Sequence, residues 1–206
     1  VTFNDLGHAT YTVNHKGEKV AKVELSIPGM HNVYNSLSAF ALATCYGVDT
    51  DAIVKGIKNF TGTDRRFQFK GQFNGVNVID DYAHHPTEIQ ATINSARGTK
   101  LNKLWIMFQP HTYTRTYNHL DDFAKVLSEA DHVILLDIYA SREKDTGLVS
   151  SKDLRDKIEA LGGVVTYCPT FNDAEKYAVD NCRKGDMLIT MGAGDVYKIG
   201  EKLVRQ

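Results

Sequence analysis

The chain lacks most features that would assign it to a specialised class of protein. Its three cysteines, Cys45, Cys168 and Cys182, are scattered over 206 residues, and none stands in a Cys-x-x-Cys pair. The sequence therefore indicates neither a disulfide framework nor a thiolate metal site, and we expect a reducing cytoplasmic location. No run approaches the roughly 20 apolar residues that a membrane span needs, so no membrane association is expected. The first residue is Val, and no secretory signal pattern is visible.

An excess of charge and the common catalytic signatures are also missing. The 24 Lys and Arg residues balance 25 Asp and Glu residues, which leaves a formal net charge of −1. A general polyanion-binding role has no electrostatic support, so no nucleic acid partner is expected. The sequence contains no GxxxxGK[ST] phosphate loop, no HExxH zinc motif and no GxSxG nucleophile motif. A hydrophobic content of 42% remains typical of an ordinary globular protein.

What is present divides the chain into two parts. Residues 8–29 alternate polar and apolar side chains around an HKGE turn, a pattern typical of a β-hairpin. Apolar residues at helical spacing predict a helix over 30–46, and a shorter helix is expected over 50–59. The turn-rich FTGTD stretch that follows is a candidate domain boundary. We therefore predict one unit over 1–61 and a second over 62–206.

The second part predicts an α/β fold. Five apolar stretches (VNVID, LWIMF, VILLDIY, GVVTY and MLITM) alternate with amphipathic helices expected at 86–97, 120–129, 151–161, 172–182 and 195–205. This alternation favours a mostly parallel, doubly wound sheet. In such sheets ligands bind beyond the carboxyl ends of the strands. Four of these ends carry polar or glycine-rich sequences, namely DDYAHHP, QPHTYTR, ASREKD and GAGD, and they form the candidate site.

The DDYAHHP stretch allows three interpretations. It is a metal site if the carboxylates and imidazoles of Asp80, Asp81, His84, His85 and His111 converge on Zn²⁺ or Mn²⁺. It is a ligand-binding or acid/base site if these groups and the phenol of Tyr82 face a substrate. It is a helix start if Pro86 occupies the first turn and His85 helps to cap it.

Three further motifs carry candidate ligand-binding groups. His111 and Arg115 lie one helical turn apart and would face one ligand, for which an arginine offers two parallel hydrogen bonds to a carboxylate or phosphate. The GTDRRF joint offers Arg65 and Arg66, and a joint arginine would reach a phosphate if two domains closed. MGAGD lacks the third glycine of a dinucleotide-binding fingerprint.

A fourth motif, MHNVYN, stands at the start of the first predicted helix. Asn32 is a suitable N-cap residue there. Alternatively, His31 and Asn35, four residues apart, would hydrogen-bond a planar heterocycle such as adenine.

Together these motifs resemble the Mur ligase family. DDYAHHPTEI, FQPHTYTRT, the GTDRRF joint, the HNVYN helix and the GAGD turn occur in the order of the family, and the resemblance covers nearly the whole chain. The first two motifs point to the member that adds L-alanine to UDP-N-acetylmuramate; the murein-tripeptide ligase is an alternative. Residues 1–61 resemble the end of the central ATP-binding domain, and 62–206 resemble the whole carboxy-terminal, Rossmann-like domain.

The resemblance implies ATP-dependent amide formation in peptidoglycan biosynthesis. A muramate carboxylate would attack the γ-phosphate of ATP to give an acyl phosphate, Mg²⁺ would neutralise charge, and L-alanine would displace phosphate. Because the phosphate loop and the initiator Met are both missing, we expect this chain to be a fragment that is inactive alone. ATP and Mg²⁺ would bind mainly to the part outside the fragment.

The resemblance also implies roles for individual residues. The central-domain side of the adenine pocket would be formed by His31, Asn32 and Asn35. Arg66 would approach the ATP phosphates and Asp81 would hold the ribose. The muramate carboxylate and alanine would meet among Tyr82, His84, His85, His111 and Arg115. Many family members have Arg where this chain has Thr112, so Arg115 would carry more of the carboxylate recognition.

Two other functional classes stay open at this stage. A metal-dependent hydrolase would use the aspartates and histidines named above, although adjacent histidines in a strand-to-helix turn tend to point apart. A non-catalytic binding module is the other, although a scaffold would not require polar residues at four strand ends. Residues 1–60 would have lost most of the core of their own domain, so exposed apolar surface and self-association are expected.

Overall fold

The computed structural model describes residues 1–205, so residue 206, the last of the predicted second unit, lies outside the described part. The chain forms two compact units. The first comprises Val1–Thr63 together with Asn94–Lys100, and the second comprises Asp64–Ile93 together with the residues from Leu101 onward. The unit boundary falls two residues after the predicted boundary at 61. The sequence pattern did not predict that 94–100 would group with the first unit.

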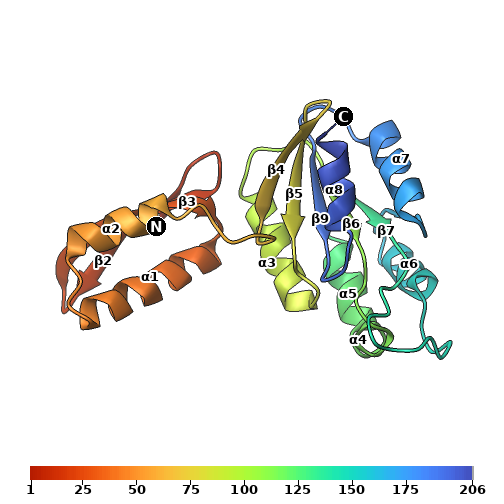
Figure 1. Ribbon diagram of the computed structural model, residues 1–206, viewed down its shortest axis with the longest axis horizontal. Helices are drawn as coiled ribbons and strands as arrows, with labels where there is room; N and C mark the ends of the chain where they lie inside the picture. Colours follow the sequence, from red (N-terminus) through yellow and green to blue (C-terminus); the bar gives the residue numbers. More distant parts are fainter. Residues whose placement is uncertain (206) are drawn as a thin grey trace. The chain divides into compact units, whose positions relative to one another are not determined.

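The first unit is an antiparallel sheet with two helices (Figure 1). Its strands are β1 (Thr2–Phe3), β2 (His8–His15) and β3 (Glu18–Pro28), and its helices are α1 (Met30–Cys45) and α2 (Thr50–Asn59). The predicted hairpin is confirmed by the pairing of β2 with β3. Its turn residues Lys16 and Gly17 both have positive φ, 50° and 88°, the combination of a tight turn that matches strand twist.

The start of α1 differs from the prediction. The helix begins at Met30, with Gly29 at φ 101° in the cap position, so the predicted N-cap at Asn32 is wrong. Asn32 instead lies in the first turn, where its side-chain nitrogen donates to the carbonyl oxygen of Pro28 at 2.7 Å. At α2, Asp49 provides a side-chain cap by accepting from two backbone N–H groups of the first turn.

The second unit confirms the predicted mostly parallel α/β fold. Its six-stranded sheet has the order β4-β5-β9-β6-β7-β8, with strands β4 (Gln68–Phe73), β5 (Val76–Asp81), β6 (Leu104–Phe108), β7 (His132–Leu135), β8 (Val165–Tyr167) and β9 (Met187–Met191). Only β4 runs antiparallel to its neighbour. All positions of β6 and β9 are buried, as expected for parallel strands covered on both faces.

The helices of the second unit follow the predicted alternation. They are α3 (Pro86–Arg97), whose last four residues group with the first unit, α4 (Tyr113–Asn118), α5 (Leu120–Leu127), α6 (Ser151–Ala160), α7 (Phe171–Asn181) and α8 (Tyr197–Leu203). Residues of α7 and α8 form one core layer with the strands, among them Ala174, Ala178, Ile199 and Leu203 against Val78 and Leu188. The short α4 and the strand β4 were not predicted. Gly71, at φ 140°, interrupts the alternation within β4.

The position of β9 decides what the carboxyl edge of the sheet contains. The last strand of the chain lies between β5 and β6, in parallel register with both (Figure 1). Met191 at its end is level with Asp81 of β5 and Phe108 of β6. The segments that follow these three strands therefore begin side by side. Within residues 1–205, no helix combines the length and apolar character of a membrane span.

Candidate functional site

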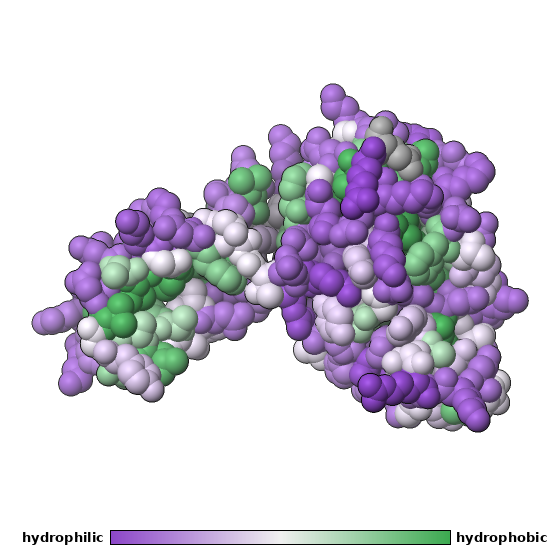
Figure 2. Space-filling model, in the orientation of Figure 1, coloured by the Kyte–Doolittle hydropathy of each residue, from purple (hydrophilic) through white to green (hydrophobic). Residues whose placement is uncertain are grey.

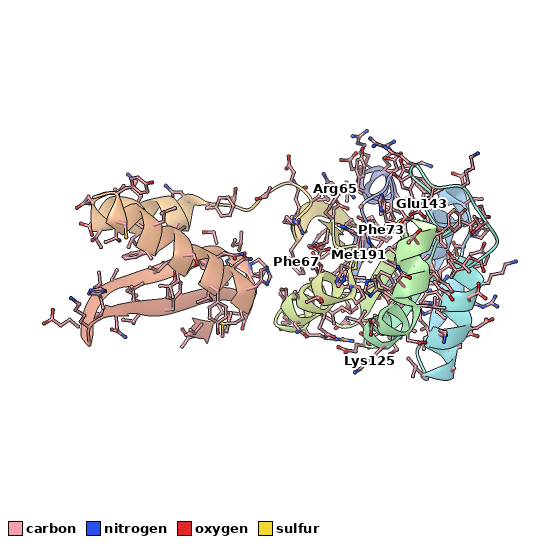
Figure 3. The ribbon with its side chains drawn as sticks, turned by 90° about the horizontal axis from the view of Figure 1, so that it is seen from below. Arg65, Phe67, Phe73, Lys125, Glu143 and Met191 are labelled. Atoms are coloured by element: carbon pink, nitrogen blue, oxygen red, sulfur yellow. The ribbon has the colours of Figure 1, made fainter. Side chains whose placement is uncertain are left out.

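Two buried aspartates end β5 and hold the joint that precedes β4. The carboxylate of Asp80, 1% exposed, accepts from Arg65 Nε at 2.9 Å and from the Thr190 hydroxyl at 2.9 Å. Asp81, 5% exposed, accepts from the backbone N–H groups of Phe67 and Ala83, each at 2.8 Å. Because successive strand residues point to opposite faces, the pair fixes the joint from both sides of the sheet. Figure 3 labels Arg65 and Phe67 on this segment.

Burial and hydrogen bonding act on Asp81 in opposite directions. Removal of the carboxyl from water raises its pKa, and the N–H groups of Ala83 and Phe67 partly offset that rise. The side chain of Thr92 is a further hydrogen-bond donor to this carboxyl. The ribose contact of Asp81 stays a prediction, and in the structure Asp81 fixes the backbone of the joint.

The two arginines of the joint have different environments. Arg65 is enclosed: its Nη2 donates to the carbonyl oxygen of Gly192 at 2.7 Å, and its guanidinium lies 4.8 Å from the ring centre of Tyr82 and 4.5 Å from that of Tyr197. Arg66 is exposed, and its guanidinium lies 5.9 Å from the Tyr82 ring. Arg65 is therefore an anchor, whereas Arg66 has the accessibility that a phosphate contact requires.

A row of aromatic rings extends along the edge from β5 to β6. The Tyr82 ring lies 5.3 Å from that of His84, the His84 ring lies 6.0 Å from that of His111, and the His111 ring stacks on Tyr139 at 5.6 Å. His84 Nδ1 lies 2.9 Å from the Tyr82 carbonyl oxygen. A carbonyl only accepts, so Nδ1 of His84 carries a proton, and the same nitrogen lies 3.5 Å from a carboxylate oxygen of Glu88.

His111 and Arg115 form the predicted pair. Arg115 Nη1 donates to His111 Nδ1 at 3.1 Å, which assigns the lone pair of His111 to Nδ1. Burial, followed by the charges of Arg115 and His84, lowers the pKa of His111. A neutral imidazole thus orients the guanidinium at physiological pH.

His85 turns away from His84. Its Nδ1 accepts from the backbone N–H of Thr87 at 3.4 Å, in agreement with the cap interpretation, and its ring lies 4.7 Å from that of His119. Across residues 1–205, no group of three or more His, Cys, Asp or Glu side chains is placed to hold a metal ion. The ligand set required by the metal-hydrolase alternative is therefore not assembled.

The candidate adenine-binding residues belong to the first unit. His31 and Asn35 are exposed on α1 and Asn32 is half-buried. Asn35 Nδ2 donates to Asn32 Oδ1 at 3.3 Å, so these two amides lie together. Their convergence with the second unit on one ligand stays a prediction.

Several residues of the edge were not selected from the sequence. They are Gln109, Tyr139, Glu143 and Tyr197. ASREKD and GAGD marked the right strand ends, but nothing in their patterns distinguished one side chain from another. Glu143 accepts from the backbone N–H of Thr114 at 2.9 Å. The buried Oε1 of Gln109 has no hydrogen-bond partner among the residues described, and a Cβ placed on Gly194 would lie 2.6 Å from it.

A mostly parallel α/β domain that gathers arginine, histidine and aspartate at its strand ends belongs to the class of domains whose strand-end groups suit carboxylate or phosphate ligands. The match with known proteins is more specific. The family model described as "Mur ligase, glutamate ligase domain" matches residues 65–194. The chain belongs to the Mur ligase family, as its motifs indicated.

Relatives and solved structures agree with this assignment. The chain is 52% identical over 205 residues to the UDP-N-acetylmuramate--L-alanine ligase of Lachnospira eligens, covering 100% of the chain and 45% of that relative. It is 50% identical over 206 residues to the ligase of that name from Agathobacter rectalis, again covering 100% and 45%. The chain therefore spans less than half the length of these relatives.

Two crystal structures show the same fold. The UDP-N-acetylmuramate-alanine ligase MurC of Thermotoga maritima has a TM-score of 0.81 at 28% identity, over 97% of this chain and 43% of that one. A murein peptide ligase of Psychrobacter arcticus has a TM-score of 0.67 at 27% identity, over 100% and 42%.

Proposed function

We propose that this chain is the carboxy-terminal part of a longer ligase that uses ATP to join L-alanine to UDP-N-acetylmuramate, in peptidoglycan biosynthesis. The observation that carries the proposal is the His111–Arg115 pair beside Tyr82 and His84, in a chain 52% identical to the Lachnospira eligens ligase. We infer that the first unit is the end of an ATP-binding central domain and that the second is the carboxy-terminal domain.

The residues present suit ATP in part. The exposed guanidinium of Arg66 suits a phosphate, and the exposed side chains of His31 and Asn35 suit the polar edge of adenine. When bound, ATP supplies the phosphoryl group that activates the muramate carboxylate. Residues 1–205 offer no cluster of metal ligands, so Mg²⁺ would be held mainly by the polypeptide outside this chain.

The second unit would position the amino acid. Arg115 would bind the carboxylate of L-alanine through two parallel hydrogen bonds, with its orientation set by His111 Nδ1. With Nδ1 facing the Tyr82 carbonyl, the neutral form of His84 would use Nε2 to accept a proton from the alanine ammonium group. The phenol of Tyr82 and the ring of His85 would line the same edge. Orientation of the two substrates supplies much of the rate enhancement in such a reaction.

The full-length protein provides the test. Arg115→Ala should raise KM for L-alanine about tenfold or more, because a charged, bidentate hydrogen bond is lost, as measured by alanine-dependent phosphate release. Arg142→Ala, an exposed arginine of the same edge, is the matched control. Unchanged alanine kinetics in Arg115→Ala would remove the assigned role. Phosphate release that required a murein tripeptide instead of L-alanine would assign the murein peptide ligase activity.

The isolated chain gives an independent test. We propose that it binds ATP weakly and does not turn over, since it has no phosphate loop. Sub-micromolar ATP binding by calorimetry would contradict this. We also propose a cytoplasmic location, because the reaction consumes ATP and the three cysteines are free thiols.

We further propose that the isolated chain self-associates through α1. This helix exposes the apolar side chains of Tyr34, Leu37 and Leu42, at 65%, 40% and 61%, and Figure 2 shows apolar surface over α1 and α2. In the longer protein this surface would pack against polypeptide outside the chain. Light scattering should show dimers or larger species for the isolated chain and monomers for Leu37→Glu, with Ser38→Glu on the same helix as control. A monomeric unaltered chain would contradict the proposal.

A further inference from the structure

We propose that Glu143 is a positioning residue for the His111–Arg115 pair, and that it thereby sets the affinity of the site for the carboxylate of the incoming amino acid. The inference rests on the proposed function and deepens it. It starts from the loop between β7 and α6, whose ASREKD sequence lies at the same edge of the sheet as the pair.

The carboxylate of Glu143 holds the first turn of α4. Its Oε2 accepts from the backbone N–H of Thr114 at 2.9 Å. The pKa of Glu143 is lowered, first by the Thr114 N–H and further by hydrogen bonds from Tyr113 N–H and the Thr112 hydroxyl. The ionised carboxylate is therefore the form that the turn stabilises, across 29 positions of sequence. Figure 3 labels Glu143, which belongs to the loop between β7 and α6.

This turn requires stabilising contacts from residues outside it. Thr112 adopts φ 66°, a left-handed backbone conformation that a β-branched residue rarely adopts. The helix that follows it, α4, has six residues, fewer than an isolated helix needs for stability. Yet α4 carries Arg115, and the strained residue separates His111 from the helix. The relative placement of the pair depends on the conformation of this turn.

The same loop is bonded to the turn at further points. The Thr112 N–H donates to the Tyr139 carbonyl at 2.9 Å, and the Tyr139 N–H donates to the Pro110 carbonyl at 2.8 Å. The Tyr139 ring stacks on His111. Tyr139 and Glu143 are thus bonded to Thr112 and Thr114, the residues that adjoin His111 and Arg115, and Glu143 contributes a charged group to these contacts.

Glu143 also acts on His111 electrostatically. Its negative charge raises the pKa of His111, whereas burial, Arg115 and His84 lower it. Loss of the charge should lower the pKa of His111 further. Loss of the hydrogen bond to Thr114 should release the turn. A glutamine retains the acceptor and removes the charge, so it separates the two effects.

The kinetic test uses the full-length protein and alanine-dependent phosphate release. Glu143→Ala should raise KM for L-alanine about tenfold with kcat within about twofold, because the lost interaction acts on substrate binding. Glu143→Gln should restore KM to within about twofold of the unaltered enzyme. Lys144→Ala, an exposed neighbour in the same loop, is the control. The KM for ATP should not change in any of these variants.

A spectroscopic test uses the 206-residue chain. Titration of His111 by NMR should show a lower pKa in both Glu143→Ala and Glu143→Gln, and no change in Lys144→Ala. If Arg115→Ala raises KM for L-alanine and Glu143→Ala does not, the positioning role is wrong while the proposed function stands. Equal effects of Glu143→Ala and Lys144→Ala would also overturn it. If Arg115→Ala has no effect, the proposed site itself fails.

Discussion

Arg65→Ala removes the cation that faces the buried carboxylate of Asp80. Three interactions of the guanidinium disappear together: the 2.9 Å ion pair with Asp80, the 2.7 Å hydrogen bond to the Gly192 carbonyl, and the contacts with the rings of Tyr82 and Tyr197. The side chain of Asp80 is 1% exposed, so water cannot replace the arginine without rearrangement. The carboxylate would be left desolvated and only partly bonded.

The expected magnitude follows from these contacts. Removing one partner of a buried ion pair typically costs about 3–5 kcal/mol. Arg65 retains 22% side-chain exposure, and the Thr190 hydroxyl still donates to Asp80. Both facts place the expected loss of unfolding free energy at the lower end of this range, about 3 kcal/mol. Alanine brings no backbone relief, because Arg65 adopts φ 59° and any residue with a Cβ is strained there.

Urea unfolding followed by tryptophan fluorescence measures this loss. Trp105 is the single tryptophan of the chain and is buried in the second unit, so its emission reports on that unit alone. Arg66→Ala is the matched control, with an expected change within about 0.5 kcal/mol. A double variant with Asp80→Asn should lose less than the sum of the single changes, because the two side chains interact directly. If the loss of unfolding free energy in Arg65→Ala exceeds the loss in Arg66→Ala by less than about 1 kcal/mol, the assignment of Arg65 as an anchor is refuted.

Two further predictions concern the same sheet. Gly192→Ala should destabilise the second unit by about 1–3 kcal/mol, because Gly192 adopts φ 142° and a Cβ would lie 2.6 Å from the Gln109 carbonyl oxygen. Gly56→Ala is the control, since a Cβ at this position of α2 would meet open space. Equal thermal stability of the two variants by circular dichroism would contradict the reasoning. Burial and its hydrogen bond to Asp137 raise the pKa of Tyr167 from 10.0 to about 12. The phenol is thus protonated in the folded state where the unfolded state ionises, and stability should fall as pH rises from about 10 to about 12. Ultraviolet titration should show a tyrosine that ionises near pH 12 and that Tyr167→Phe removes. An unchanged titration curve in Tyr167→Phe above about pH 11, or ten tyrosines titrating together, would exclude the shift.

Much of the fold was predictable because its signals are local. The strand LWIMF, all apolar, and the amphipathic helix over 86–97 appear in the structure with the predicted bounds. β4 was missed because Gly71 breaks its alternation. α4 was missed because its start depends on a left-handed Thr112 that distant Glu143 and Tyr139 support.

The site was predictable to a different degree. Motif spacing placed His111 and Arg115 one helical turn apart, and their side chains do meet. The RRF motif named both arginines equally, yet one is an anchor and the other is exposed. A sequence pattern does not contain the Asp80 carboxylate, the Gly192 carbonyl and the two tyrosine rings that separate their roles.

The sequence by itself determined the class of fold, the family and the strand ends at which polar groups gather, since hydrophobic periodicity and motif spacing extend over neighbouring residues. Only the tertiary structure decided that the last strand, β9, lies between β5 and β6, and so which strand ends meet. It also decided that adjacent His84 and His85 face different neighbours, and that Glu143 reaches α4 across 29 positions. These contacts join residues far apart in sequence, and their free energy depends on distance, burial and hydrogen-bond direction, which the order of residues does not specify.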